Sequence, residues 1–282
     1  MKFRECPVVF RCEGERLAGI VSVPETPAER GVVIVVGGPQ YRVGSHRQFT
    51  LLARALAEEG TATIRFDYRG MGDSEGEARG FEDVGADIRA SVDQLMSSVP
   101  HVRQVVLWGL CDAASAALFY AQHDARVAGL VLCNPWVRTD AGVAKTQLKH
   151  YYASRFVAPA FWAKLARGEI NVLESGVEFV RDVCKATMSR RSNAEPGSPP
   201  SLPHRMARAL SQFDGKVLLV LSGKDLTAAE FCDAAKASAE WRGLLAAPRV
   251  TRVELPEADH TLSRAQWRTA VEERTGQWLR GW

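Results

Sequence analysis

The feature that most constrains the fold is a series of short apolar segments separated by amphipathic helical segments. The five residues at 32–36 are Val, Val, Ile, Val and Val, and two glycines follow directly. A continuous β-branched run of this length is typical of a strand that is covered on both faces. Similar strands are expected at 61–66, 105–108, 127–133, 217–221 and 249–255, with helices between them at 46–59, 82–97, 112–122, 228–241 and 264–280. This alternation predicts an α/β protein with a mostly parallel sheet and helices on both faces.

The N-terminal segment and a long interruption complete the predicted organisation. The first 23 residues alternate weakly and predict two antiparallel edge strands joined near Glu13 and Gly14, which brings the sheet to eight strands. The interruption at 137–205 has no strand pattern, and its aromatic and aliphatic residues recur at helical spacing. It ends in a segment rich in proline, glycine and serine. We therefore predict a core formed by 1–136 and 206–282, with a helical cap inserted at 137–205.

Composition and charge exclude several classes of protein. With 46% hydrophobic and 24% charged residues, the chain of 282 residues has the composition of a globular protein. Its net charge of +3 is too small to indicate a nucleic-acid partner. No segment approaches the roughly 20 apolar residues that a membrane span requires. Charged residues follow Lys2 and Arg4 closely and leave no room for the apolar part of a signal peptide, so we expect a cytoplasmic protein.

The cysteines and histidines indicate neither disulfides nor a metal. None of the six cysteines forms a CxxC pair, and the six histidines show no HExxH or similar spacing. Most of the cysteines are expected to be buried hydrophobic residues. Cys111 is the exception, and no metal or other cofactor is predicted.

Cys111 stands directly between a predicted strand and an alanine-rich predicted helix. The residues two before and two after it are Gly109 and Ala113. Small residues at these positions are what a nucleophile on a sharp, strained turn requires, because larger side chains would collide within the turn. The N-terminus of a helix favours the thiolate form of the cysteine. The backbone N–H of Asp112 is then expected to stabilise a developing oxyanion.

An acid and a base follow this nucleophile in the chain. Asp225 comes shortly after the predicted strand at 217–221, and His260 shortly after the one at 249–255. Both are expected at the carboxyl ends of strands, where open α/β sheets bind ligands. We predict that His260 transfers the proton and that Asp225 orients it and stabilises the imidazolium. Asp259 is a weaker candidate for the acid, because adjacent side chains rarely point at one another.

These motifs resemble those of the α/β-hydrolases, and the resemblance covers nearly the whole chain. The segment at 65–74, with the sequence RFDYRGMGDS, is similar to their D-x-R-G-x-G-x-S turn. The segments at 37–47 and 109–113 resemble those of the exosortase A system-associated hydrolases of type 1, which are bacterial hydrolases encoded beside exopolysaccharide and protein-sorting machinery. The Cys-Asp-His set is also similar to that of the dienelactone hydrolases. The resemblance implies an α/β-hydrolase fold but no particular substrate.

The loop at 37–40 departs from the pattern of the family in two respects. Gly37 replaces the histidine that usually precedes the oxyanion glycine, and Pro39 has no N–H to donate. The backbone N–H of Gln40 is therefore the expected second oxyanion donor.

Two further residues are candidates for substrate binding. His46 would contact an acidic substrate, although helix initiation with Ser45 as the N-cap is the favoured interpretation of this segment. Trp136 and the aromatic residues of the cap would line an acyl pocket, although aromatic residues at helical spacing more often form a core. Ser115 lies one helical turn beyond Cys111 and is not expected to compete as a nucleophile.

The sequence therefore predicts a hydrolase that cleaves an ester, thioester or lactone through Cys111, His260 and Asp225 and a covalent acyl-enzyme. Its partner would be a small acyl substrate, and no oligomeric state is predicted. Two alternatives stay open. One is an acyltransferase with the same nucleophile, and the other is a non-catalytic binding protein on the hydrolase fold.

Overall fold

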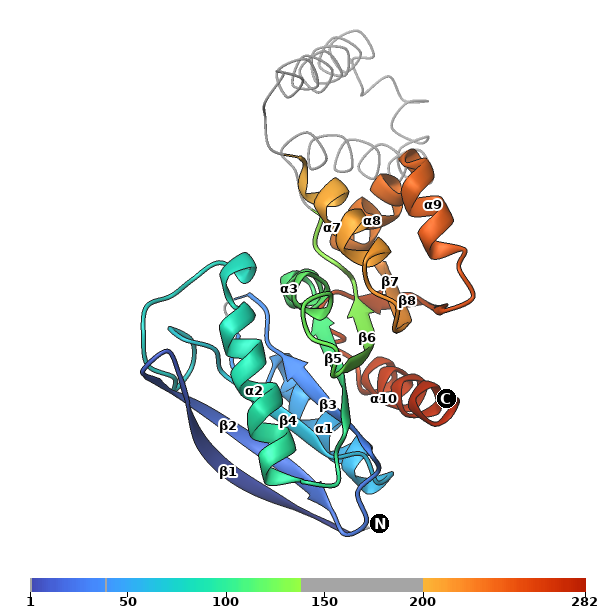
Figure 1. Ribbon diagram of the computed structural model, residues 1–282. Coiled ribbons are helices and arrows are strands. Elements are labelled where there is room, and N and C mark those ends of the chain that lie inside the picture. The colour runs from blue at the N-terminus through green and yellow to red at the C-terminus, as the bar shows by residue number, and fades with distance from the viewer. Residues whose placement is uncertain (1, 39, 138–199) are drawn as a thin grey trace, which may run out of the picture.

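The computed structural model describes residues 2–38, 40–137 and 200–282. Within these residues the strands form one eight-stranded sheet in the order β1-β2-β4-β3-β5-β6-β7-β8 (Figure 1). The strands are β1 (Phe3–Cys12), β2 (Glu15–Pro24), β3 (Arg30–Val35), β4 (Thr63–Phe66), β5 (Gln104–Leu110), β6 (Val127–Cys133), β7 (Lys216–Lys224) and β8 (Val250–Asp259). This topology confirms the predicted α/β architecture with an eight-stranded, mostly parallel sheet.

The sheet is antiparallel at its N-terminal edge and parallel elsewhere. Strand β2 pairs antiparallel with both β1 and β4, whereas every pair from β4 to β8 is parallel. The tight turn between β1 and β2 places Glu13 and Gly14 at positive φ angles of 49° and 95°, as a two-residue hairpin loop requires. The predicted hairpin is therefore present, but of its two strands only β1 lies at the edge of the sheet, because β2 is hydrogen bonded on both sides.

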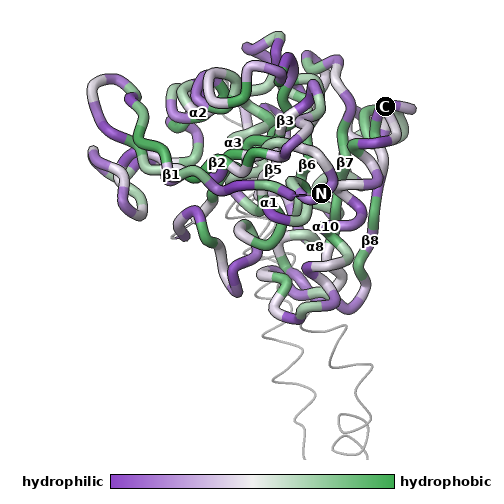
Figure 2. The backbone as a smooth tube through the Cα atoms, turned by 90° about the horizontal axis from the view of Figure 1, so that it is seen from below, coloured by the Kyte–Doolittle hydropathy of each residue, from purple (hydrophilic) through white to green (hydrophobic). Residues whose placement is uncertain are grey.

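Helices cover both faces of the sheet, as predicted (Figure 1). They are α1 (Gln48–Glu58), α2 (Gly85–Ser98), α3 (Asp112–Ala121), α7 (Leu202–Ser211), α8 (Leu226–Ala237), α9 (Ala239–Leu245) and α10 (Ala265–Arg280). Alternate residues of a strand point to opposite faces of the sheet and pack in two separate hydrophobic cores. Val33 and Val35 pack on the face covered by α2 and α3, whereas Val32 and Ile34 pack on the face covered by α1 and α10. Hydrophobic residues accordingly concentrate along the strands in the interior (Figure 2).

Two predicted helices differ from the observed ones. The helix predicted at 228–241 is two helices, α8 and α9, which are separated at Ser238 by extended backbone with φ −108° and ψ 127°. The Ser238 hydroxyl accepts the Trp241 N–H at 3.3 Å, so a local side-chain cap begins α9. The helix predicted at 46–59 begins as α1 at Gln48, after a 3₁₀ turn at Ser45–Arg47. The predicted cap by Ser45 is wrong, because no side-chain cap is formed there and the Ser45 N–H instead donates to Gln40 Oε1.

Most of the predicted cap lies outside the described residues, which end at 137 and resume at 200. Helix α7 begins at Leu202, and its buried residues Met206 and Leu210 belong to the same core as α2 and α3. Residues 202–205, which were predicted to belong to the cap, thus form the first turn of a helix that packs on the core. No helix in the described part of the chain is long and apolar enough to span a bilayer.

Candidate active site

Cys111 occupies the tight turn between β5 and α3. Its backbone has φ 64° and ψ −126°, a conformation that non-glycine residues rarely adopt. The Cys111 N–H donates to the Cys133 carbonyl at 2.9 Å, and the Cys111 carbonyl accepts the Trp136 N–H at 3.1 Å. These bonds to the end of β6 hold the strained turn in place. The cysteine is partly exposed.

The turn also depends on the absence of a side chain at Gly109. A Cβ atom there would lie 2.5 Å from the carbonyl carbon and oxygen of Ala113. Since Ala113 is itself almost fully buried, neither side of this contact has room to move. A side chain larger than a hydrogen atom at position 109 would therefore collide with the backbone of the same turn.

The structure brings Asp225 and His260 together beside Cys111. His260 Nδ1 lies 2.8 Å from Asp225 Oδ2, and the imidazole is also hydrogen bonded to the Cys111 side chain. Cys111, Asp225 and His260 directly follow β5, β7 and β8, so the three side chains meet at one edge of the sheet. Because Nδ1 faces Asp225, Nε2 is the ring nitrogen left for the thiol.

The alternative acid, Asp259, points elsewhere. Its carboxylate accepts the backbone N–H of Ser263 at 2.9 Å and also the Ser263 hydroxyl. Asp225 is almost fully buried and additionally accepts the N–H of Thr227 at 2.9 Å, as the N-cap of α8. Asp225, rather than Asp259, is therefore the carboxylate in contact with His260.

The surroundings of His260 favour its charged form. Its hydrogen bonds to Asp225 and to Cys111 outweigh partial burial and raise the pKa of His260 to about 10. An imidazolium is thus expected at neutral pH, directly beside the thiol. Such a cation stabilises a neighbouring thiolate.

The loop after β3 approaches the start of α3 through Gly37 and Gly38. The Gly38 N–H donates to Asp112 Oδ2 at 3.0 Å, and Asp112 Oδ1 accepts the Ala113 N–H at 3.0 Å. A Cβ atom at Gly37 would overlap the Asp112 carboxylate, which explains why no histidine fits there. Of the two expected donor residues, Asp112 lies at the turn, whereas Gln40 is seen to accept the Ser45 N–H through its side chain.

The loop at 67–74 holds Arg42, in the loop after β3, through hydrogen bonds and an ion pair. Asp67 accepts the backbone N–H groups of Arg42 at 2.6 Å and of Asp73 at 3.0 Å. It also forms an ion pair with the Arg42 guanidinium, and the Ser74 hydroxyl donates to the Asp67 carbonyl at 2.6 Å. These bonds fix the segment at Arg42, in the loop after β3, to the loop that follows β4.

The two candidate substrate-binding residues differ in exposure and in the groups near which they lie. His46 is exposed, and its charge acts on Asp259, the neighbour of His260. Trp136 is partly buried, and its backbone bonds both to Cys111 and, through its carbonyl at 2.7 Å, to the Ser115 hydroxyl. Ser115 is fully buried in α3, so it is structural. The aromatic residues expected to complete an acyl pocket lie outside the described residues.

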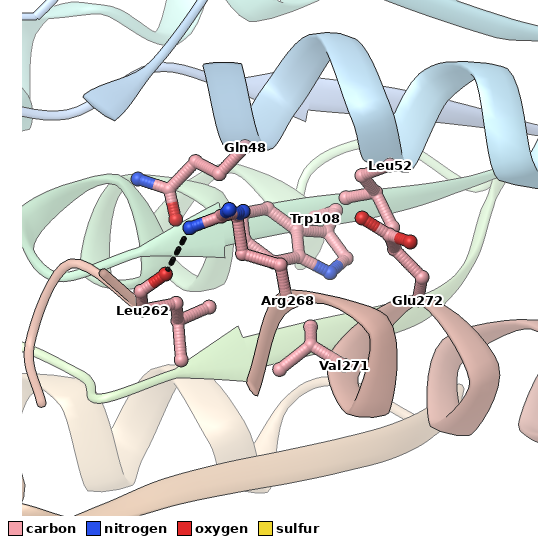
Figure 3. Close-up of a pocket in the computed structure, with 7 residues that line it drawn as sticks. All are labelled: Gln48, Leu52, Trp108, Leu262, Arg268, Val271 and Glu272. Atoms are coloured by element: carbon pink, nitrogen blue, oxygen red, sulfur yellow. Dashed lines mark hydrogen bonds between the residues drawn. The ribbon is translucent and has the colours of Figure 1, made fainter. Parts of the chain in front are cut away.

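A small cavity lies beside the nucleophile strand β5, between α1 and α10 (Figure 3). Its volume of about 10 Å³ has room for one water molecule. Gln48 and Trp108 contribute buried polar side-chain atoms, and Arg268 Nη1 donates from the same place to the carbonyls of Leu262 and Ser263 at 2.9 and 2.8 Å. The cavity is too small for a substrate, but its lining ties the loop after His260 to α10.

A larger open cavity of about 330 Å³ is lined in part by Asp225. It is lined by residues of β7, β8 and α8, including Cys232, Lys236 and Arg252. Cys111 lines neither of these two cavities. Among the described residues, no group of three or more histidine, cysteine or acidic side chains could hold a metal ion.

Two features of the site were not predicted from the sequence. Asn134 and Ser222 form a buried pair in which the Asn134 amide bonds both the side chain and the backbone N–H of Ser222, at 3.0 and 2.8 Å. This pair joins the ends of β6 and β7. The second feature is the inward position of the Asp112 carboxylate. The substitution of Gly37 for histidine is the sequence signal that could have indicated it.

The sequence matches the model of the alpha/beta hydrolase family over residues 32–273. The chain therefore belongs to the α/β-hydrolase family. Its structure is similar to that of the Pyrococcus furiosus esterase Pf2001, with a TM-score of 0.66 and 16% identity over 99% of this chain and 92% of that chain. It is also similar to the dienelactone hydrolase of Anabaena variabilis, with a TM-score of 0.62 and 15% identity over 100% and 99% of the two chains. At these identities the similarity shows the fold.

A curated relative matches part of the chain. The polyketide transferase grgF of a Penicillium species is 26% identical over 128 residues, which are 43% of this chain and 42% of that protein. The match thus spans less than half of the length of either protein.

Proposed function

We propose that the protein is a hydrolase of small acyl substrates that uses Cys111 as a covalent nucleophile. The observation that carries the proposal is the contact of one imidazole with both a thiol and a buried carboxylate at the carboxyl edge of the sheet. In the proposed reaction, the Cys111 thiolate attacks the carbonyl carbon of an ester, thioester or lactone. The His260 imidazolium protonates the leaving group, and the neutral imidazole then activates water to hydrolyse the thioester intermediate.

The remaining roles follow from position. Asp225 holds His260 with Nδ1 toward the carboxylate and stabilises the imidazolium. The Asp112 N–H, at the start of α3, stabilises the tetrahedral oxyanion. As the second donor, the Gly38 N–H is favoured over the Gln40 N–H because it already points toward the start of α3. His46 and Trp136 are proposed to contact the substrate.

Acyl transfer to an acceptor other than water is the second candidate. The partial match to a polyketide transferase favours it, and a thioester intermediate is chemically able to react with an alcohol, amine or thiol. The proposed association with exopolysaccharide and protein-sorting systems rests on the sequence resemblance at 37–47 and 109–113.

Intact-protein mass spectrometry after exposure to a panel of acyl thioesters and esters tests the proposal. We expect a transient acyl adduct on the wild-type protein that disappears in Cys111→Ala and accumulates in His260→Ala. Products formed with and without an added alcohol or amine separate hydrolysis from transfer. An adduct that persists in Cys111→Ala would contradict the assignment of the nucleophile. Equal, slow iodoacetamide labelling of all six cysteines would instead favour a binding protein.

A further inference from the structure

The Asp112 carboxylate is held by backbone N–H groups from two separate segments. Oδ2 accepts from Gly38, in the loop after β3, and Oδ1 accepts from Ala113, in the first turn of α3, each at 3.0 Å. The N–H of Asp112 itself also stabilises the ionised carboxylate. The N–H groups of Gly38 and Ala113 thus converge on one negatively charged pair of oxygens and form an anion-binding site.

One of these donors, the Gly38 N–H, is also the proposed second oxyanion donor, and the first proposed donor is the N–H of Asp112 itself. A carboxylate oxygen matches a tetrahedral oxyanion in charge and in its capacity to accept N–H bonds. The two anions therefore compete for the same donors, and they would repel each other if both were present. In the described conformation the Asp112 side chain accepts the Gly38 N–H that a reacting substrate would use.

The Asp112 carboxylate is held by hydrogen bonds, but its burial disfavours the ionised form. Burial raises the pKa of Asp112 above its ordinary value, although the N–H groups of Gly38 and Ala113 act against this rise. The negative charge also acts on Tyr68, whose pKa burial and Asp112 together raise to about 12. Burial in an apolar environment thus offsets part of the stabilisation by the donors, and displacement of the carboxylate costs correspondingly less.

We propose that the Asp112 side chain is the resting occupant of the oxyanion site and that a substrate must displace it before Cys111 is acylated. The inference rests on the proposed function. In the displacement no covalent bond changes, because the substrate carbonyl oxygen only replaces the carboxylate on the N–H groups. In the next step the Sγ–C bond forms, and the π electrons of the carbonyl move onto its oxygen, which the freed N–H groups stabilise.

This arrangement makes Asp112 a specificity-determining residue. Displacement of the carboxylate takes free energy, which a substrate supplies through contacts away from the reacting carbon. Small activated esters lack such contacts. We therefore expect the wild-type protein to react slowly with p-nitrophenyl acetate compared with larger acyl thioesters, and removal of the carboxylate to benefit the small ester most.

Two reactions of the same thiol test the proposal. Acylation by p-nitrophenyl acetate passes through an oxyanion, whereas alkylation by iodoacetamide does not. We expect Asp112→Ala to raise the ratio of the acylation rate to the alkylation rate of Cys111 by about tenfold or more. Asp112→Asn, which keeps the shape but removes the charge, should raise it less. Asp214→Ala, a change at an exposed residue between α7 and β7, is the control and should leave the ratio unchanged.

The outcomes separate this proposal from the function on which it rests. A ratio that is unchanged or lower in folded Asp112→Ala and Asp112→Asn, with wild-type acylation intact, would overturn the role of Asp112 alone. If only the asparagine variant folds, its ratio decides. Absence of acylation in every variant, with normal alkylation of Cys111, would overturn the acyl chemistry and this proposal together.

Discussion

Cys111 and Cys133 lie at the same ends of neighbouring parallel strands, and a single backbone hydrogen bond joins them. Cys133 continues its strand in ordinary extended backbone, is fully buried, and has a raised pKa because burial disfavours its thiolate. Cys111, one residue beyond the partner of Cys133 in the sheet, lies in a strained turn, is partly exposed and touches an imidazole. The local backbone conformation, rather than the residue type, therefore decides which of the two thiols is available for chemistry.

The largest expected effect is on catalysis and tests whether the two thiols differ as proposed. Cys111→Ala should lower kcat/KM for a reactive thioester by about 10⁴-fold or more, because it removes the nucleophile. Cys133→Ala should change kcat/KM little, because its thiol faces the core. Steady-state hydrolysis rates of the two purified variants provide the measurement. Comparable losses in both would break the distinction between the thiols.

The second prediction concerns Asp225, the carboxylate that raises the pKa of the His260 imidazole beside Cys111. Asp225→Asn should lower kcat about 100-fold, since a neutral amide no longer stabilises the imidazolium. Because Asp225 is the largest cause of the raised pKa of His260, this pKa should fall from about 10. The imidazolium, which protonates the leaving group, would then be lost at a lower pH, so the alkaline limb of the kcat/KM profile should move to lower pH. Asp259→Asn is the matched control, and an equal shift there would contradict the assignment.

The third prediction concerns the turn that exposes Cys111. Gly109→Ala should lower the free energy of unfolding by about 3 kcal/mol, because the added methyl group collides with buried backbone. Gly243→Ala in α9, where an added Cβ meets nothing within 4 Å, should instead be neutral or slightly stabilising. Urea unfolding of both variants gives the comparison. An unaffected Gly109→Ala protein would show that the turn can relax.

The fourth prediction exchanges sulfur for oxygen at each site. Cys133→Ser should destabilise the protein by about 2 kcal/mol, since it places a hydroxyl in a fully buried apolar position. Cys111→Ser should change the free energy of unfolding by less than this, because the side chain is partly exposed and has His260 as a hydrogen-bond partner. Thermal unfolding of the two variants measures the difference, and the reverse order would be inconsistent with the contrast in burial.

The smallest expected effect is on the pH dependence of stability. Because the pKa of His260 is raised to about 10 in the folded protein, the stabilisation from its charged contacts is fully present below its unfolded value of about 6.5. That stabilisation is lost as the pH rises through about 10. The free energy of unfolding of wild type minus that of His260→Gln should therefore decrease between pH 6 and pH 10. A difference that grows over this range would show that the pKa is not raised.

The sequence was sufficient to predict the fold and the strand ends at which the candidate residues lie, because both depend on local patterns. Strand β6 was predicted with its exact limits, and the turn at Cys111 follows from the small residues Gly109 and Ala113 between an apolar strand and a helix. The chain order also placed Asp225 and His260 at strand ends, and the parallel register of β5 to β8 then brings these ends together.

The features that were missed depend on contacts between segments far apart in the chain. Sequence periodicity cannot show that the Gly38 N–H meets the Asp112 side chain, 74 residues away. The break between α8 and α9 was missed for another reason, since Ser238 interrupts a segment whose helical spacing continues on both sides. The helical cap predicted at 137–205 lies mostly outside the described residues and stays a prediction.

The close approach of Gly37 to the Asp112 carboxylate constrains how this protein can change during evolution. The two positions share one volume, so a histidine at 37 is compatible only with a smaller residue at 112. A chain that carried both would have to open the loop after β3. Mutations at these two sites are therefore expected to show strong epistasis, in which the order of substitution decides whether the intermediate protein folds.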